Sequence, residues 1–466
     1  MLQDLRRQSQ QIDDADATQK GWITSVWLAV VVACVYILLA KLSLALLTPE
    51  GVAVFWPAAG FAAGILIAFG PSARWAVAIG TIVATILANL LGDRNIPSSV
   101  VFALCNAGEA LLTAGLIERY FGSPFNLHSL RNVLGFLGAA IIAAAASGIG
   151  GAIGFSLFHD AAASIYVTWQ NWFASDGLGI VTVAPLVIGL ASVVRHPPPR
   201  SETIEGVGAL ATLVVISVIV IALPQTSWAA VVPVALLFPV LLWIAARCRP
   251  VFAAAATFTV TLAIVWTTTI GFGHFADPAL PMADRVLTAR AGILAVALCA
   301  YVLAALFAER RTQAAALADG EARLQEALTA GSVATFVWEA GTNAAQRSAN
   351  APQILGFDPQ ETFSSRDFLA RVHPDDRERF KSLVYGVKPD RPNYSATFRF
   401  KHPDGREVWL EETAKAEFSS TGHLLRVKGL TIDTSARRGS EDEQGLRASA
   451  LDQLLARFVT VAKGTY

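Results

Sequence analysis

Apolar positions form long unbroken runs over the first two thirds of this chain, and they alternate with polar positions over much of the remainder. A bilayer core requires about 20 apolar residues in a helix, and ten runs come close to or exceed that length. We therefore predict a polytopic α-helical membrane bundle of eight to ten spans. The ten runs are residues 22–47, 51–70, 75–92, 98–117, 133–158, 177–194, 206–223, 228–246, 251–272 and 286–308.

Prolines mark two of these runs as unusual. Pro57 follows Trp56 near the start of the second run, and Pro233 and Pro239 lie in the eighth. Proline is tolerated in the first turn of a helix, where its missing N–H costs nothing, but it interrupts a helix interior. Trp56 suits a membrane interface, with its ring buried and its N–H in water. We expect broken, re-entrant or deep-starting helices here, so eight and ten spans both remain open.

Basic residues concentrate in every second connecting segment, and Lys and Arg remain on the cytoplasmic side of a membrane. With ten spans and a cytoplasmic N-terminus, the inner segments carry twelve such residues. The outer loops carry Arg94 and Arg285, or four basic residues if Lys41 and Arg290 near the outer helix ends are included. This asymmetry predicts that both termini lie in the cytoplasm.

Composition and cysteine spacing argue against a nucleic-acid partner and a metal site. The chain has 466 residues, of which 54% are hydrophobic and 15% charged, and its formal net charge is zero. A neutral chain gives no overall attraction to nucleic acid. The four cysteines lie at or before residue 299 without metal-ligand spacing, so we expect packing cysteines and no metal site.

Polar residues inside the apolar runs are candidates for function, because ionisable groups in hydrocarbon are costly and usually face the bundle interior. Asn106 and Glu109 lie one turn apart in the fourth run, and Asp176 precedes the sixth. One interpretation is structural: Asn106 and Glu109 hydrogen-bond to a neighbouring helix, and Asp176 caps a helix N-terminus. The other is that these side chains contact a ligand.

Three segments in order resemble the first class of bacterial membrane-associated sensor domains, MASE1. They are FWPAAGFAAGILIAFG, NAGEALLTAGLIERYFG and WFASDGLGIVTVAPLVI. The resemblance covers about residues 22–310 and implies a multi-span module, usually of eight helices, that precedes cytoplasmic signalling domains. The family provides no established ligand residue, so Trp56, Pro57, Glu109 and Asp176 are matched positions and membrane-domain candidates.

Beyond residue 332 the pattern predicts an α+β domain. VATFVWE reads as a strand, three short helices are plausible at 352–355, 364–372 and 374–384, and SATFRFKH, REVWLEETAKAEF and LLRVKGLTID read as three antiparallel strands. The turns PDG and STG suit hairpins.

The same sequence segments resemble a PAS domain with its C-terminal PAC portion, over residues 332–438. The matching pieces include FVWE, DFLARVHPDDRERF, FRFKHPDGREVWLEE and GLTIDTSARR. The resemblance implies an antiparallel sheet that either binds a small molecule against the short helices or holds a filled core. Six alternating strand residues are pocket candidates: Phe336, Trp338, Phe398, Phe400, Trp409 and Leu425.

The cofactor of this domain is unknown. No cysteine follows Cys299, which argues against a flavin–cysteinyl photosensor. His373 is either a haem ligand or a surface or capping residue. Asp433 and Ser435 stand where the PAS family has an Asp-x-Thr at the exit of the last strand, and they are candidates for linking the domain to its output.

The domain boundaries predicted from these patterns are a cytoplasmic tail (1–20), a membrane sensor domain (21–308), a helical linker (309–331), a PAS/PAC domain (332–438) and a C-terminal linker or helix (439–466). Leu317, Leu324 and Leu328 in the linker have the spacing of a short parallel coiled coil, which would make the chain a homodimer. An exposed linker helix is the alternative.

We expect a bacterial inner-membrane receptor that senses a stimulus through its transmembrane bundle and relays it through the PAS domain. The bilayer, an unknown small-molecule signal and a kinase or response-regulator partner are the expected contacts. No catalytic residue or catalytic domain is visible. The chain is alternatively the input half of a sensor histidine kinase, or of a diguanylate cyclase or phosphodiesterase, and less favourably a PAS-regulated transporter, since no internal repeat is evident.

Overall fold

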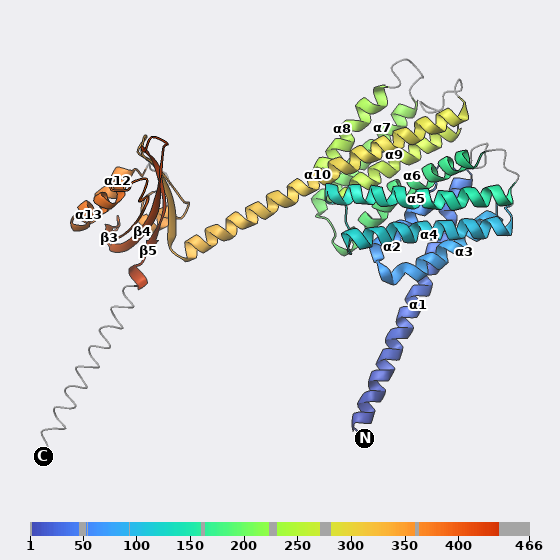
Figure 1. Cartoon of the computed structure of the whole chain (residues 1–466), viewed down its shortest axis with the longest axis horizontal. Coiled ribbons are helices and arrows are strands. Elements are labelled where there is room, and N and C mark those ends of the chain that lie inside the picture. The colour runs from blue at the N-terminus through green and yellow to red at the C-terminus, as the bar shows by residue number, and fades with distance from the viewer. Residues whose placement is uncertain are drawn as a thin grey trace. The chain divides into compact units, whose positions relative to one another are not determined.

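The computed structural model describes residues 2–45, 53, 55–92, 94–159, 164–222, 231–270, 281–358 and 363–437. The chain divides into two compact units, Met1–Gln313 and Ala314–Tyr466. The first unit is a helical bundle and the second contains an antiparallel sheet with short helices (Figure 1). The predicted C-terminal segment 439–466 lies outside the described residues.

The bundle contains ten α-helices in the described part of the chain, eight of them long and apolar enough to cross a membrane. The two shorter apolar helices, α2 and α8, fall in the proline-bearing second and eighth runs. The predicted membrane bundle is therefore confirmed. The helices are α1 Leu2–Leu44, α2 Pro57–Phe69, α3 Arg74–Leu90, α4 Ile96–Phe121, α5 Leu130–Phe158, α6 Ile165–Arg195, α7 Arg200–Ala222, α8 Val231–Arg247, α9 Pro250–Ile270 and α10 Met282–Ala330.

Helix α2 begins inside the bundle. Its 13 residues correspond to about 20 Å at 1.5 Å per residue, less than the bilayer core of about 30 Å. Pro57 occupies the first turn, and the backbone N–H of Trp56 donates to the carbonyl of Ser175 in the middle of α6 at 3.1 Å. A helix that starts at this depth explains a Trp-Pro pair at the head of an apolar run.

Glycines allow α2 to pack closely along α6 (Figure 1). A Cβ at Gly60 would meet the backbone carbonyl of Gly179, and a Cβ at Gly179 would meet the carbonyl of Trp56. Small residues at helix contacts are the usual means of close approach in membranes, where apolar burial adds little attraction.

The start of α6 differs from the sequence expectation. The helix begins at Ile165, capped by Ser164, whose hydroxyl accepts from the Val167 N–H at 3.3 Å. Asp176 therefore lies within α6, and its interpretation as a helix cap is wrong. The reason is that the first turns, IYVTWQNWF, mix polar with aromatic residues, so the apolar run starts later than the helix.

Basic side chains gather at one end of the bundle and bind helix C-terminal carbonyls. Arg195 donates to Ala68 at 2.7 Å, and Arg311 donates to Ala246 at 2.7 Å. Cations are favourable at helix C-termini because the backbone dipoles leave partial negative charge there. This end of the bundle is the end that the charge pattern assigns to the cytoplasm.

Helix α10 joins the last apolar run to the predicted linker in one element of 49 residues. Val286, Ala289 and Ile293 near its start are buried among the other helices. The helix ends at Ala330, and the first strand begins at Val333. Membrane span and linker are thus continuous in secondary structure.

The second unit has a five-stranded antiparallel sheet in the order β2-β1-β5-β4-β3. Helices α12 and α13 cover one face of it (Figure 1). The elements are β1 Val333–Glu339, β2 Ala344–Arg347, α11 Ala351–Leu355, α12 Ser365–Arg371, α13 Pro374–Tyr385, β3 Asn393–Lys401, β4 Glu407–Phe418 and β5 Leu424–Asp433.

The predicted strands and short helices are found within two residues of their expected ends. Strand β2, an edge strand of four residues, AAQR, was not predicted. It contains neither β-branched nor aromatic residues, which are the usual signal for a strand. The strand forms because it pairs with β1, for example with Trp338 opposite Ala345.

Candidate ligand-binding sites

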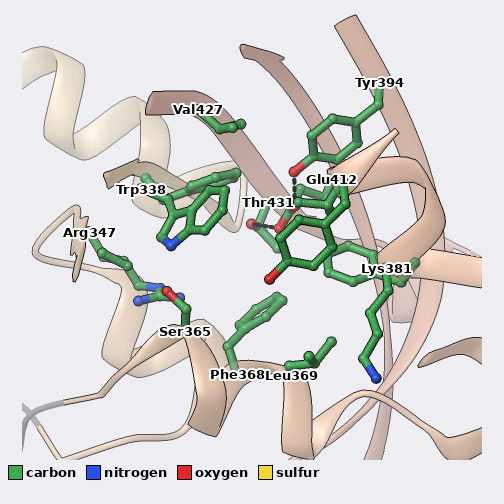
Figure 2. A pocket seen from close by; sticks show the side chains of 15 residues that line it. Trp338, Arg347, Ser365, Phe368, Leu369, Lys381, Tyr394, Glu412, Val427 and Thr431 are labelled. Carbon is green, nitrogen blue, oxygen red and sulfur yellow. Dashed lines mark hydrogen bonds between the residues drawn. The ribbon is translucent and has the colours of Figure 1, made fainter. Parts of the chain in front are cut away.

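A cavity of about 80 Å³ lies between the helix-facing side of the sheet and helices α12 and α13. Figure 2 shows its lining, in which aromatic side chains surround a few polar groups. At about 10 to 15 Å³ for each water-sized group, this volume holds about five to eight such groups. The cavity therefore suits a small ligand or a cluster of waters.

Glu412 is the acidic residue of this cavity, and its side chain is buried, 4% exposed. Along β4 the buried positions alternate, and Glu412 occupies an inward position between Leu410 and Ala414. The Tyr394 hydroxyl donates to Oε1 of Glu412 at 2.6 Å, and the Thr431 hydroxyl donates to Oε2 at 3.3 Å (Figure 2). The pairing of β4 with β5 brings the Thr431 and Glu412 side chains together, since Thr431 is directly opposite Glu412.

Burial raises the pKa of Glu412 to about 7, although the hydrogen bonds from Tyr394 and Thr431 and the charge of Arg347 act in the opposite direction. Burial also raises the pKa of the Tyr394 hydroxyl, and the neighbouring Glu412 adds to this effect. A carboxyl group with a pKa near 7 changes its charge within the physiological range.

Arg347 lines the cavity as a cation (Figure 2). Its guanidinium group donates to the Phe363 carbonyl at 3.3 Å and lies over the rings of Phe363 and Phe368 at 5.0 and 5.4 Å. Burial lowers the pKa of Arg347. Lys381 of α13 also lines the cavity (Figure 2). The cavity thus presents two cations and a titratable carboxyl group beside its aromatic side chains, so it can bind a ligand that carries polar groups.

Two of the six predicted pocket residues line the cavity, Phe336 and Trp338. Phe398 and Phe400 are fully buried and fill the core beside it. Trp409 points to the other face of β4, where the Arg399 guanidinium lies 5.9 Å from its ring centre. Leu425 is 49% exposed near the start of β5.

The predicted exit residues, Asp433 and Ser435, form hydrogen bonds that connect the end of β5 to β4. Oδ1 of Asp433 accepts from the backbone N–H of Ser435 at 2.9 Å, and the Ser435 hydroxyl accepts from the backbone N–H of Trp409 at 2.8 Å. The backbone N–H of Asp433 donates to the carbonyl of Ser332 at 3.1 Å. The start of β1 and the end of β5 are therefore hydrogen-bonded to each other beside the end of α10.

His373 is the N-cap of α13. Its Nδ1 accepts from the backbone N–H of Asp375 at 3.3 Å, as the capping interpretation expects. Within the described ranges, no group of three or more His, Cys, Asp or Glu side chains is arranged to hold a metal ion.

A second cavity, of about 50 Å³, lies in the membrane bundle. Asn106 and Asp176 line it from α4 and α6, together with the ring of Trp56. The Asn106 amide donates to the Thr85 hydroxyl of α3 at 3.4 Å, which agrees with the interhelical bond expected for it. Glu109 lies one turn further along α4, beside Asp176.

Of the remaining membrane candidates, Trp56 lines this cavity, whereas Pro57 and Glu109 do not. The Trp56 indole N–H donates to the Tyr36 hydroxyl of α1 at 3.2 Å, and Pro57 opens α2. The structure therefore brings Trp56, Glu109 and Asp176 together, although they are 120 residues apart at the extremes. The Glu109 and Asp176 carboxyl groups interact through a side-chain hydrogen bond between α4 and α6, in agreement with the structural interpretation of Glu109.

Sequence reasoning missed Glu412, Tyr394 and Arg347 as cavity residues. Glu412 was detectable, because the alternation in REVWLEETAKAEF places it on the same face as Val408, Leu410 and Ala414. Arg347 was not, because it belongs to the unrecognised strand β2.

The chain is thus a multi-pass helical membrane protein with a PAS domain. Residues 24–311 match the MASE1 family, and residues 345–431 match the PAS fold. Because the first match covers well over half of the chain, this protein belongs to the MASE1 family.

A curated relative, the uncharacterized protein y4lL of Sinorhizobium fredii (strain NBRC 101917 / NGR234), is 28% identical over 138 residues. The match covers 29% of this chain and spans 16% of that relative's length.

Two solved structures are similar to part of this chain. One is a sensory box histidine kinase/response regulator from Burkholderia thailandensis, 24% identical, with a TM-score of 0.25 over 28% of this chain and 98% of that chain. The other is the N-terminal domain of a diguanylate cyclase with PAS/PAC sensor from Marinobacter aquaeolei, 22% identical, with a TM-score of 0.20 over 23% of this chain and 98% of that chain.

Proposed function

We propose that this protein is a bacterial inner-membrane signal receptor, in which the helical bundle senses a stimulus and α10 relays it to the PAS domain. The observation that carries the proposal is the continuity of α10. Its first turns are buried in the bundle, and the helix runs without a break to Ala330, three residues before Val333 of β1. A change in the seating of α10 among the other helices would therefore reach the first strand directly.

The hydrogen bond between Asp433 and Ser332 extends this route to the exit of the domain. Ser332 follows α10, and Asp433 precedes the residues held by Trp409. A displacement at the end of α10 would act on β1 and on the outgoing chain together.

A substitution at Arg290 tests the relay without knowledge of the stimulus. Arg290 on α10 donates to Asn171 of α6 at 2.9 Å, so Arg290→Ala loosens α10 within the bundle. We expect altered hydrogen exchange in residues 314–339 and 424–433, measured by mass spectrometry on the full chain in lipid nanodiscs. Arg74→Ala, which removes an exposed ion pair with Glu118, is the control.

Replacement of Ala314, Ala315 and Ala316 by Gly-Pro-Gly should abolish the effect of Arg290→Ala on the PAS domain, because it breaks α10. If Arg290→Ala leaves hydrogen exchange in the PAS domain unchanged, the relay is refuted.

We propose in addition that the receptor is a homodimer. Leu317 and Leu324 lie seven residues apart on α10 and are 66% and 62% exposed in the single chain. Heptad spacing of leucines favours a parallel helix pair. In a variant without the four native cysteines, Leu317→Cys and Leu324→Cys should each form disulfide-linked dimers in membranes, whereas Tyr385→Cys, an exposed position at the end of α13, should not.

The output would pass to a two-component partner, either a histidine kinase domain or a response regulator. Incorporation of labelled phosphate by the purified chain alone would contradict this assignment, because it would require a kinase centre within these residues.

A further inference from the structure

Glu109 of α4 is buried in the membrane bundle beside Asp176 of α6. The two side chains are 2% and 3% exposed. The Phe102 ring of α4 has its centre 4.9 Å from that of the Trp172 ring of α6. Asn106 of α4 lines a cavity together with Asp176. Because residues four and seven positions apart share one face of a helix, the α4 face that carries Glu109 packs along the turns of α6 that carry Asp176.

Asp176 is the hydrogen-bond partner of Glu109. Neither carboxyl oxygen of Glu109 receives a hydrogen bond from an N–H or O–H group of the described residues. Ionised carboxylates only accept hydrogen bonds, and two like charges in contact repel strongly away from water. The hydrogen bond between these two carboxyl groups therefore requires a proton on one of them, as in other buried carboxyl pairs that share a proton.

The surroundings of the two groups assign this proton to Glu109. Oδ1 of Asp176 accepts from the Ser175 hydroxyl at 3.4 Å, and the Trp172 indole adds a second favourable contact. Hydrogen-bond donors stabilise the ionised form of a carboxyl group. Glu109 has no such donor among the described residues. The arrangement is therefore a neutral Glu109 that donates to an ionised Asp176.

The adjoining cavity gives Asp176 a route to water. Its volume of about 50 Å³ holds about three to five water molecules. Leu44, Asn89 and Phe155 line it from the ends of α1, α3 and α5, at the end of the bundle opposite the arginine-rich end. With the orientation that the charge pattern predicts, protons reach the carboxyl pair from the periplasm.

Other charged or titratable side chains also face the pair or its cavity. Tyr36 of α1 and Cys105 of α4 interact electrostatically with both carboxyl groups. Arg94 lines the cavity, and His159 at the end of α5 packs against two of its aromatic rings. Because histidine ordinarily titrates near neutral pH, His159 is the group that an experiment on pH must separate from Glu109.

We propose that Glu109 and Asp176 form a proton-binding site, and that release of its proton is the stimulus of the receptor. This assignment rests on the receptor function proposed above and gives the chemical nature of its ligand. The proton leaves Glu109 through Asp176 to water in the cavity. Two carboxylates then remain in contact, and their repulsion drives α4 and α6 apart.

The contacts that hold α2 and α10 lie next to Asp176 on α6. The carbonyl of Ser175 accepts from the Trp56 N–H at 3.1 Å. Asn171, little more than one turn before Asp176, accepts from Arg290 of α10 at 2.9 Å. A shift of α6 at Asp176 therefore acts on α10, whose other end precedes β1.

Infrared spectroscopy of the full chain in lipid nanodiscs detects this proton, because the carbonyl stretch of a neutral carboxyl group is separate from the carboxylate bands. At neutral pH we expect the wild type to show such a band that Glu109→Gln lacks. Asp176→Asn should retain it at a shifted frequency. Glu118→Gln, at the other end of α4, should leave it unchanged.

Identical spectra of the wild type and Glu109→Gln in this region would overturn the proposal. A band that Asp176→Asn loses and Glu109→Gln keeps would place the proton on Asp176 and overturn its assignment to Glu109.

Isotopic labelling makes the result independent of the folding of Glu109→Gln. Glu412→Gln, a change in the PAS domain, removes the other buried glutamate of the described residues and leaves the bundle unaltered. In this variant, carbon-13 in the side-chain carboxyl groups of glutamate should shift the neutral band, whereas carbon-13 in those of aspartate should not. A neutral band that does not shift with labelled glutamate would refute the assignment.

Hydrogen exchange of residues 314–339 tests whether the proton acts on the relay. Glu109→Gln stays neutral, so the wild type and this variant should exchange alike at acid pH and differ at alkaline pH, where Glu109 is ionised. His159 is present in both proteins, so its titration cancels. A neutral infrared band with identical exchange at both pH values would refute the proton as the stimulus, whereas failure of Arg290→Ala to alter exchange refutes the relay itself.

Discussion

At the scale of single residues, Glu412 combines burial with a pKa near neutrality. The neutral acid can donate a hydrogen bond, whereas the ionised form accepts only and carries a charge into an aromatic cavity. Its neighbours Tyr394 and Thr431 both donate to it in the structure. The protonation state of one side chain therefore changes what the PAS cavity offers a ligand.

The folded PAS domain should lose stability as Glu412 ionises. Its folded pKa of about 7 lies above the value of 4.5 for an ordinary glutamate, so the contribution is complete below about pH 4.5 and is lost as the pH rises through 7. Relative to Glu412→Gln, which stays neutral, the wild-type domain should lose about 2 to 3 kcal/mol between pH 4.5 and 8. Urea unfolding of residues 314–466 over this range measures the difference. A wild-type-minus-variant stability that is flat with pH would show that Glu412 has an ordinary pKa.

Phe398 and Leu425 were predicted to belong to one pocket, yet their surroundings differ. Phe398 is fully buried, with its ring centre 4.5 Å from that of Phe380, whereas Leu425 is 49% exposed. Phe398→Ala should cost about 3 to 5 kcal/mol of unfolding free energy because it leaves a cavity. Leu425→Ala should change it by about 0.5 kcal/mol or less. Equal losses in chemical denaturation would mean that the exposure of Leu425 is misassigned.

At the scale of elements, the contact of α2 with α6 depends on the absence of side chains. Gly60→Val would direct a Cβ at the Gly179 carbonyl and force α2 away from α6. Overpacking of this kind costs about 1 to 3 kcal/mol, so we expect a lower melting temperature for the detergent-solubilised protein. Gly208→Ala is the matched control, since nothing lies within 4 Å of its added methyl group. An unchanged melting temperature for Gly60→Val would contradict the packing.

Elements with a strong local signal could be predicted from the sequence. Strands β1 and β5 were predicted with their ends as the structure has them, because apolar residues and turn residues delimit both. The first turns of α6 could not be predicted, because their mixture of polar and aromatic residues resembles a loop in a hydropathy pattern. β2 has no strand signal of its own and exists through its pairing with β1.

The sites were harder to predict from the sequence than the helices and strands, because they depend on contacts between elements that are distant in the chain. Strand parity places Glu412 inside, yet aromatic size drew attention to Trp409, one position off the inward face. The meeting of Glu109 with Asp176 depends on how α4 and α6 pack together, and spacing along the chain does not encode that contact.

At the scale of the whole molecule, the arrangement of charge predicts an orientation. Arg195, Arg249 and Arg311 bind backbone carbonyls at one end of the bundle, and the cavity of Asp176 lies toward the other. Arginine-rich ends stay in the cytoplasm because their translocation is unfavourable. The cavity of Asp176 would then face the periplasm while the PAS domain remains in the cytoplasm.

Cysteine labelling in intact cells checks this orientation. In a variant without the four native cysteines, Tyr166→Cys lies at the start of α6, at the cavity end, and Leu425→Cys lies in the PAS domain. Both positions are exposed, so access depends on the side of the membrane. A membrane-impermeant maleimide should label the first and spare the second until the cells are lysed. Labelling of Leu425→Cys in intact cells would reverse the orientation and place the arginine-rich end outside, against the charge rule that supports the receptor assignment.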